Sequence, residues 1–339
     1  MTSQTPDTET SLPRAFFAVQ AGGHGLDDLR LAETELPRPG EGEAVVEMLR
    51  MAINPADLLM LEGRYGTQPE PPFVPGAEGV GRVVGVGPGV ELAPGTVVVP
   101  LGSGNWCSHR VLKARHLVPL PAGADLDQAA MLKANPATAL VMLEDLVRLE
   151  PGDWVVMNAA NSAVGQNVVA LGRALGLKIG CVVRREAAAG MLREMGAEAV
   201  LVDDGSGPPP GLPEGAQAKL AFDAVGGAAT ERLAALVADG GTVVTYGLLS
   251  GESPRLSAHD LVFRGLTLRG FWLADWFAQA SPERARELFG RLAGWLAEGR
   301  IGARVAARYP LERVAEAVAH AAREGRDGKI LLTANGGAG

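Results

Sequence analysis

Short apolar runs separated by Gly and Pro make up the first third of the chain. The segments EAVVEML (43–49), GRVVGVGPGV (81–90) and GTVVVPL (95–101) have this form, and the pattern extends from residue 14 to about residue 123. Brief apolar stretches bounded by turn-forming residues are typical of β-strands joined by tight turns. The pattern therefore predicts an all-β module built as a small barrel.

After Ala124, strand-like runs alternate with helix-like segments. The strand-like runs are residues 154–157, 178–184, 200–202, 220–225, 241–247 and 266–270. The helix-like segments between them include residues 162–175, 186–195 and 228–238. Strands that alternate with helices in this way form βαβ units, which build a parallel sheet with both faces covered. We therefore predict that an α/β domain with a doubly wound parallel sheet follows the β module.

The last part of the chain contains both helical and extended patterns. Helices are predicted for residues 282–299 and 311–324, and strands for residues 303–309 and 329–333. We expect this tail to rejoin the first module. The predicted domains are residues 1–124 for the β module, 125–270 for the α/β domain and 271–339 for the returning segment.

Composition and charge exclude several classes of protein. Of the 339 residues 47% are hydrophobic, which argues against disorder, and the net charge of −8 argues against general nucleic-acid binding. Residues 154–172 carry no charge, but their Asn, Gln and Ser side chains favour a buried strand and helix over a membrane span. The N-terminus resembles neither a signal peptide nor a transit peptide, and cysteine is scarce, which together predict a cytoplasmic location.

The reactive side chains form no recognisable metal or nucleophile motif. Two cysteines and five histidines are scattered along the chain, without a CxxC, HxxxH or GxSxG pattern. A zinc site requires three or four ligands at suitable spacing. The sequence therefore predicts a protein without a bound metal.

A turn of small residues, NAANSAVGQ (158–166), joins the first strand of the α/β domain to its helix. The backbone N–H groups at such a helix start bind a pyrophosphate. Ala159, Ser162 and Ala163 stand where glycine is usual in the GxGxxG fingerprint, so the motif alone leaves an ordinary strand–helix turn as the alternative.

The next strand ends in Arg184, Arg185 and Glu186. In a nucleotide-binding fold this end faces the adenosine ribose, where an acid favours NAD and an arginine accommodates the 2′-phosphate of NADP. The arginines favour NADPH and Glu186 argues against it, while a solvated surface cluster is the alternative.

Tyr65 lies between glycines in the β module, in the loop EGRYG (62–66). A loop tyrosine can donate its hydroxyl to a substrate oxygen. A partly packed, structural tyrosine is the more common case, and the loop sequence does not decide between the two.

Taken together, these segments resemble the medium-chain dehydrogenase/reductase superfamily, and within it the zinc-free, mitochondrial-type trans-2-enoyl thioester reductases. The resemblance spans residues 14–333 and implies a GroES-like β domain followed by a Rossmann domain. The matching segments are INPAD (53–57), GRYG (63–66), PGAEGVGRVVGVG (75–87), ANPAT (134–138), NAANSAVGQ, CVVRRE (181–186), DAVGG (223–227), GGTVVTYG (240–247) and LRGFWL (268–273).

The resemblance implies NADPH-dependent reduction of a 2-enoyl thioester, carried on CoA or an acyl carrier protein, with Tyr65 as the active-site residue. Residues 53–57 lack the cysteine of zinc-containing relatives, and Ala77 replaces their histidine. The residues implied to bind NADPH are Asn135, Asn161, Ser162, Ala163, Val164, Arg184, Arg185, Glu186, Tyr246, Gly247, Leu248, Leu249, Phe271, Trp272, Leu273, Ala274 and Lys329.

The resemblance also implies a homodimer, formed through the sheet edge near residues 266–270. Two other functions remain open. One is an NADPH-dependent quinone or activated-alkene reductase from a neighbouring branch of the superfamily. The other is a non-catalytic, NADPH-binding structural protein, as are the superfamily members that serve as lens crystallins.

Overall fold

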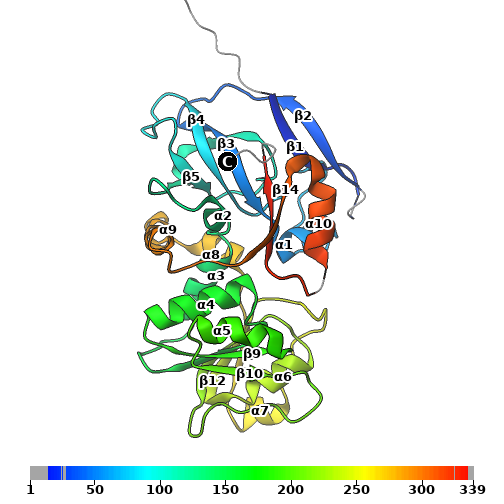
Figure 1. Cartoon of the computed structure of the whole chain (residues 1–339), viewed down its shortest axis with the longest axis vertical. Coiled ribbons are helices and arrows are strands. Elements are labelled where there is room, and N and C mark those ends of the chain that lie inside the picture. The colour runs from blue at the N-terminus through cyan, green and yellow to red at the C-terminus, as the bar shows by residue number, and fades with distance from the viewer. Residues whose placement is uncertain (1–13, 24, 26–27, 324, 335–339) are drawn as a thin grey trace, which may run out of the picture. The chain divides into compact units, whose positions relative to one another are not determined.

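The structure is a computed structural model, and it describes residues 14–334 apart from residues 24, 26, 27 and 324 (Figure 1). The start of the predicted N-terminal domain, residues 1–13, lies outside the described residues. The chain divides into two compact units. Unit 1 consists of residues 1–130 and 305–339, and unit 2 of residues 131–304.

Unit 1 is built on a two-stranded ribbon and a larger sheet. The ribbon pairs β1 (Arg14–Gln20) with β2 (Leu29–Glu35) in antiparallel fashion. In the larger sheet the order is β14-β15-β3-β4-β5-β7, and β6 also pairs with β3. Its strands are β3 (Glu43–Ala52), β4 (Gly79–Val86), β5 (Val97–Pro100), β6 (His109–Lys113), β7 (Leu117–Pro119), β14 (Val305–Pro310) and β15 (Lys329–Thr333). Because β15 pairs with β3, the end of the chain completes the sheet that the beginning forms.

Short helices close the core of this unit. They are α1 (Pro55–Leu61), α2 (Leu126–Ala129) and α10 (Val314–Ala322). Met48, Trp106 and Ile330 are fully buried in one apolar cluster, and the Trp106 ring nitrogen donates to the carbonyl of Ala52 at 3.2 Å. Gly76 (φ +107°) has no room for a side chain, since a Cβ would lie 2.5 Å from the Trp106 ring.

Unit 2 contains a six-stranded parallel sheet in the order β10-β9-β8-β11-β12-β13. Counted from the first strand of the unit, this order is 3-2-1-4-5-6, which is that of the Rossmann fold. The strands are β8 (Trp154–Met157), β9 (Lys178–Val183), β10 (Ala199–Val202), β11 (Ala218–Asp223), β12 (Val237–Thr245) and β13 (Thr267–Gly270). The predicted α/β fold and all of its strand-like runs are confirmed.

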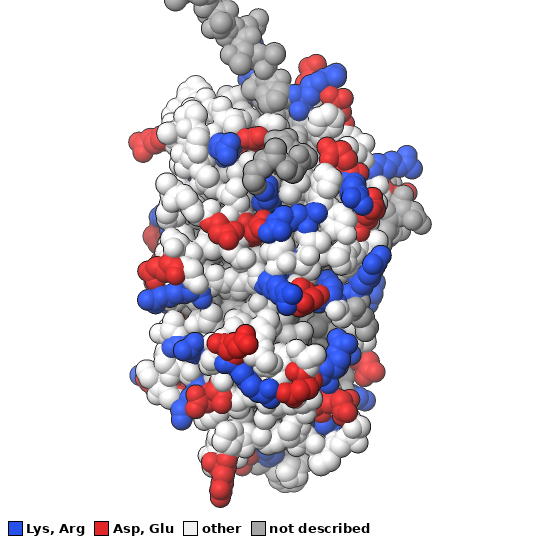
Figure 2. All heavy atoms as spheres, in the orientation of Figure 1, with Lys and Arg blue, Asp and Glu red and all other residues white. Residues whose placement is uncertain are grey.

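The helices between these strands are α4 (Ala163–Ala174), α5 (Ala189–Glu194), α6 (Ala228–Ala234) and α7 (Ala258–Val262). The helix predicted to end at residue 238 stops at Ala234, because Val237 already pairs with Ala218 of β11. None of the helices that the structure describes combines the length and apolar character needed to cross a bilayer. On the face shown in Figure 2, acidic and basic side chains are interspersed.

Three further helices belong to unit 2. They are α3 (Asn135–Glu144), α8 (Leu273–Gln279) and α9 (Pro282–Ala297). The return to unit 1 therefore begins at Val305, whereas the sequence predicted it at residue 271. The first boundary also differs, because α2 packs on β3 and β4, where Asp127 pairs with Arg50 at 3.4 Å.

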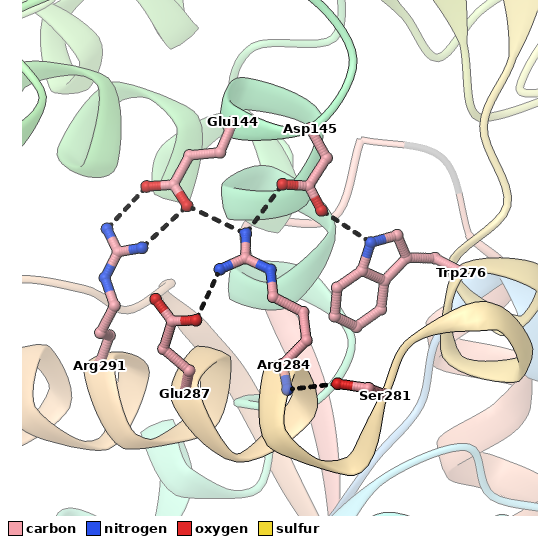
Figure 3. Close-up of polar contacts among 7 residues, drawn as sticks. All are labelled: Glu144, Asp145, Trp276, Ser281, Arg284, Glu287 and Arg291. Atoms are coloured by element: carbon pink, nitrogen blue, oxygen red, sulfur yellow. Dashed lines mark hydrogen bonds and ion pairs between the residues drawn. The ribbon is translucent and has the colours of Figure 1, made fainter.

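Ion pairs hold α9, and a hydrogen bond holds α8, to the end of α3 (Figure 3). Both oxygens of Glu144 accept hydrogen bonds from Arg291, at 2.7 and 2.8 Å. Asp145 accepts from Arg284 and from the ring nitrogen of Trp276, each at 2.8 Å. The amphipathic pattern of residues 282–299 identified a helix with a buried face, but it carried no information about which unit covers that face.

Candidate active site

The predicted cofactor segments of unit 2 all follow the C-terminal ends of parallel strands. Residues 161–164 follow β8, residues 184–186 follow β9, residues 246–249 follow β12 and residues 271–274 follow β13. Parallel strands end at a common edge, so the structure brings these segments to the same edge of the sheet. Open α/β sheets bind their ligands in the crevice at this edge. Asn135, the remaining predicted contact in this unit, is buried at the start of α3.

The turn between β8 and α4 forms the nucleotide-type helix start without the usual glycines. Ala159 adopts φ +47°, a left-handed conformation that normally favours glycine. Ser162 caps α4, since its hydroxyl oxygen accepts from the N–H of Gly165 at 3.1 Å. A Cβ on Gly165 would lie 2.2 Å from the carbonyl oxygen of Ala160, so only glycine permits this close approach. The start of α4, where Asn161 is exposed and residues 162–164 are half-buried, can therefore receive a pyrophosphate.

A buried polar network that the sequence analysis missed supports this turn. Asn158 donates to Asp223 at 2.6 Å and accepts from the N–H of Ala224 at 2.8 Å. Asp223 also accepts from the hydroxyl of Thr230 at 2.7 Å. These bonds join β8 to β11, the neighbouring strands between which the direction of strand progression reverses. A polar residue at the C-terminal end of each of two apolar strands, here Asn158 just after β8 and Asp223 as the last residue of β11, is the sequence signal that indicates such a network.

Tyr246 closes the other side of the turn, directly after β12. Burial raises the pKa of its hydroxyl well above the usual value, and a hydrogen bond with Ser162 opposes that shift. The neighbouring Leu248 and Leu249 are more than half exposed, at 54% and 58%. The edge therefore combines a polar floor with apolar side chains that a nicotinamide or an acyl group can contact.

The charged residues after β9 differ in their pairing. Arg184 and Arg185 are exposed, and neither forms an ion pair with a residue that the structure describes. Glu186 is also exposed, but its carboxylate is bound by Arg193 of α5 at 2.7 Å. The two arginines are thus available to an anionic ligand at this end of the sheet.

In unit 1, helix α1 determines the position of Tyr65. The N–H of Gly63 donates to Met60 at 3.1 Å and that of Arg64 to Leu59 at 2.8 Å, which together form a Schellman motif. Gly63 has φ +71°, as this motif requires. Tyr65 follows immediately and is half-buried. Helix α1 was not predicted, although Asn54 before it, Pro55 as its first residue and Gly63 after it are recognised boundary signals.

A buried polar cluster fixes the start of α1. Asp57 accepts from the N–H groups of Asn54 and Ala77, each at 2.8 Å. Asn54 donates to Glu78 at 2.9 Å, and its side-chain oxygen accepts from the ammonium of Lys329. That ammonium also donates to the carbonyl of Ile53 at 2.9 Å. Lys329 thus ties β15 to α1 inside unit 1, and its predicted contact with the cofactor stays a prediction.

Burial shifts the pKa values of both ionisable ends of this cluster. It raises the pKa of Asp57 to about 6, although the hydrogen bonds from Asn54 and Ala77 oppose the shift. Burial lowers the pKa of Lys329 to about 8, against the attraction of Glu78 and Asp57. Both groups are therefore charged between about pH 6 and pH 8.

An apolar cavity of about 740 Å³ lies in unit 1 and borders the Tyr65 loop. Thr67 and Gln68, just after Tyr65, line it together with Met60 of α1 and Phe73. The side-chain amide of Gln68 also donates to the carbonyl of Tyr65 at 3.0 Å, which orders the loop beside the cavity.

The residues do not fit a zinc site. No cluster of three or more His, Cys, Asp or Glu side chains able to hold a metal occurs among the described residues. Cys107 and Cys181 are buried, and burial raises the pKa of each thiol to about 12, which disfavours the thiolate that zinc binds. Asn54, Asp57 and Glu78, next to the positions where zinc-containing relatives carry ligands, are hydrogen-bonded to one another or to backbone N–H groups.

Comparisons with known proteins agree with this architecture. Residues 40–122 match the family described as "Alcohol dehydrogenase GroES-like domain", and residues 163–292 match "Zinc-binding dehydrogenase". The chain is 36% identical to the mitochondrial enoyl-[acyl-carrier-protein] reductase of Homo sapiens, over 95% of this chain and 89% of that protein. The reductase of the same name from Caenorhabditis elegans is 35% identical, over 83% of each chain.

Two solved structures are also similar. A putative NADPH:quinone reductase from Bacillus thuringiensis has a TM-score of 0.87 and 29% identity, and the match covers 95% of this chain and 100% of that one. A mitochondrial 2-enoyl thioester reductase heterodimer from Candida tropicalis has a TM-score of 0.83 at 24% identity, with the same coverage, and supports the fold.

These comparisons correct the predicted cytoplasmic location. The relatives from animals, Dictyostelium discoideum and Arabidopsis thaliana are named mitochondrial enzymes, which points to mitochondria. The prediction was wrong because it rested on the composition of the N-terminus and on the scarcity of cysteine. The scarcity of cysteine does not distinguish the cytoplasm from another reducing compartment.

The raised pKa of Asp57 predicts a specific dependence of stability on pH. Between the ordinary value of 3.8 and about 6, the folded protein retains a proton that the unfolded chain releases, so stability falls as pH rises. We expect the free energy of unfolding of wild type, minus that of Asp57→Asn, to fall by about 2 kcal/mol from pH 4 to 6. Urea denaturation at a series of pH values measures this difference.

Asp153→Asn is the matched control. Hydrogen bonds from Lys219 and the Glu150 N–H hold the pKa of Asp153 below its usual value, so its contribution is lost only as the pH falls below about 4. If the difference between wild type and Asp57→Asn were constant from pH 4 to 6, Asp57 would ionise in the folded protein as it does in the unfolded chain.

Proposed function

The chain belongs to the family of mitochondrial-type enoyl thioester reductases, in the medium-chain dehydrogenase/reductase superfamily, and we propose that it reduces trans-2-enoyl thioesters with NADPH. The observation that carries the proposal is the edge of the parallel sheet in unit 2. There, a helix start suited to a pyrophosphate lies next to a strand followed by two arginines, neither of which forms an ion pair with an acid among the described residues. CoA and acyl carrier protein thioesters are both substrates under this proposal.

The residues at this edge fit NADPH. We assign the pyrophosphate to the start of α4, from Asn161 to Val164, and the 2′-phosphate to Arg184. Arg185 and Glu186, residues 246–249 and 271–274, Asn135 and Lys329 remain further predicted contacts. When bound, NADPH supplies a hydride for the β-carbon of the enoyl group.

We propose that the hydroxyl of Tyr65 donates a hydrogen bond to the oxygen on which negative charge develops during the reaction. Reduction at the β-carbon moves negative charge onto the thioester oxygen, giving an enolate whose α-carbon then takes a proton. A fixed hydrogen-bond donor at that oxygen stabilises charge that exists mainly in the transition state. Support comes from the Schellman motif that ends α1, because Tyr65 directly follows that motif and its side chain is half-buried.

A quinone reductase is the second candidate function. The likeness to the putative quinone reductase from Bacillus thuringiensis favours it, because that protein shares the fold at 29% identity. Oxidation of NADPH with crotonyl-CoA, with a longer enoyl-CoA and with a quinone separates the two functions. Turnover of the quinone alone would support the second, and NADPH binding without any turnover would support a structural role.

We also propose a homodimer formed through the β13 edge of the parallel sheet. Leu261, Val262 and Phe263 precede this edge strand and are 46%, 70% and 79% exposed. Adjacent apolar side chains with this exposure are typical of a protein–protein interface. An edge strand also offers unpaired backbone groups to a second copy.

Replacing Tyr65 with Phe should lower kcat/KM for an enoyl thioester by about 10²- to 10³-fold, because the donor to the enolate oxygen is lost. The affinity for NADPH should not change. Tyr309→Phe is the matched control, since it removes a hydroxyl from the same unit that contacts His320 at 3.0 Å. Full activity of Tyr65→Phe in a steady-state assay would refute the assignment.

Replacing Arg184 with Ala should raise the Kd of NADPH by about 10- to 100-fold, since a charge-assisted bond to the 2′-phosphate is lost. NADH lacks that phosphate, so its Kd should change less than about threefold. Arg148→Ala, which removes an exposed arginine of the same unit, is the control. Fluorescence titration measures both constants, and equal losses would show that the phosphate binds elsewhere.

Replacing Phe263 with Glu should convert the dimer to a monomer, because a charge in an apolar interface is costly to desolvate. Val202→Glu is the control, since Val202 is 39% exposed on β10, at the opposite edge of the sheet. Sedimentation velocity measures the mass of each variant. A monomeric Val202→Glu with a dimeric Phe263→Glu would place the interface at β10 instead.

A further inference from the structure

Two acidic side chains flank the arginines at the end of β9. Glu186 follows them in the chain, and Asp203 follows β10, the neighbouring strand. The N–H of Asp203 donates to the carbonyl of Val183 at 2.8 Å, so this acid lies beside the residue that precedes Arg184. Unpaired carboxylates at these positions would repel a phosphate bound to the arginines.

Each of these acids is bound by an arginine that a helix supplies. Arg193 of α5 binds Glu186 at 2.7 Å. Arg232 of α6 binds both carboxylate oxygens of Asp203, one of them at 2.7 Å. The next acid along the chain, Asp204, accepts two hydrogen bonds from Ser206, at 2.7 and 2.9 Å.

The two pairs differ in exposure. The side chains of Asp203 and Arg232 are only 9% and 21% exposed, whereas those of Glu186 and Arg193 are 67% and 53% exposed. The first pair is therefore part of the packed structure. The second lies in solvent, so its contribution to stability is small and its removal should leave the fold intact.

We propose that Arg193 and Arg232 determine the preference for NADPH by neutralising Glu186 and Asp203, the two acids beside the 2′-phosphate site. They are positioning residues, because they act through the acids and not on the nucleotide. The inference rests on the proposed function insofar as that function places the adenosine ribose at the end of β9. Glu186 lies at a position where an acidic residue normally favours NAD. Its pairing with Arg193 explains how it is compatible with NADPH.

Arg193→Met tests the proposal, because methionine keeps the apolar stem and removes the charge. Glu186 then faces the 2′-phosphate, which carries between one and two negative charges at neutral pH. We expect the Kd of NADPH to rise about fivefold at low salt, and the effect to shrink at high salt through screening. NADH lacks the phosphate, so its Kd should change less than about twofold. Fluorescence titration without substrate measures both constants.

The double variant Arg193→Met/Glu186→Gln separates an indirect role from a direct one. If Arg193 acts through Glu186, removal of the acid should return the Kd of NADPH to within about twofold of the wild-type value. If Arg193 binds the phosphate itself, the double variant should remain as weak as the single one. That result, or equal weakening of NADPH and NADH, would overturn the proposal.

Arg232→Met and Arg232→Met/Asp203→Asn repeat the test at the second acid, with thermal unfolding as a check because this pair is more buried. The Kd values of NADPH and NADH are measured without turnover. Failure of the proposed reaction can therefore be distinguished from failure of this inference. If the protein reduced no enoyl thioester but the variants changed the Kd of NADPH and NADH as expected, the proposed function would be refuted and the inference would not. Equal affinity of the wild type for NADPH and NADH would overturn the inference.

Discussion

Parallel pairing of the six strands in unit 2 is the constraint on which the proposed chemistry depends. It places the ends of β8, β9, β12 and β13 at one edge, so segments that are more than 100 residues apart in the chain meet there. The buried hydrogen bonds of Asn158 with Asp223 and with the N–H of Ala224 hold the two central strands at the point where the topology reverses. Without that register, the start of α4 and the arginines after β9 could not contact the same ligand.

Unit 1 depends on a comparable constraint, which its own C-terminal strand satisfies. Asp57 caps the start of α1 and Glu78 holds Asn54, and both carboxyl groups are fully buried. Buried acids need a counter-charge or they take up protons. Lys329 brings that charge from β15, so the end of the chain secures the helix from which Tyr65 emerges.

The parts of the fold that the sequence predicted are those encoded by local pattern. Buried parallel strands are apolar runs such as WVVM (154–157), and these were located correctly. The position of α8 and α9 was not predictable, because the pair between Glu144 and Arg291 joins residues 147 positions apart. Helix α1 was missed because seven mostly apolar residues show no clear periodicity, and the Asn158–Asp223 network because its partners lie on different strands.

Charge compensation between separate elements explains why residue types alone do not show which charges are open to a ligand. The rule that an acid after the second strand favours NAD counts Glu186 as a free charge, yet Arg193 engages it. In unit 1 the acids next to the positions of the zinc ligands in related enzymes are likewise engaged, by hydrogen bonds with Asn54 and Ala77 and by the attraction of the Lys329 ammonium. In each case a basic side chain from a separate element supplies the charge, so ligand selectivity follows from which charges remain unpaired. The net charge of −8 gives no information about this selectivity, because a total charge does not show which charges are paired.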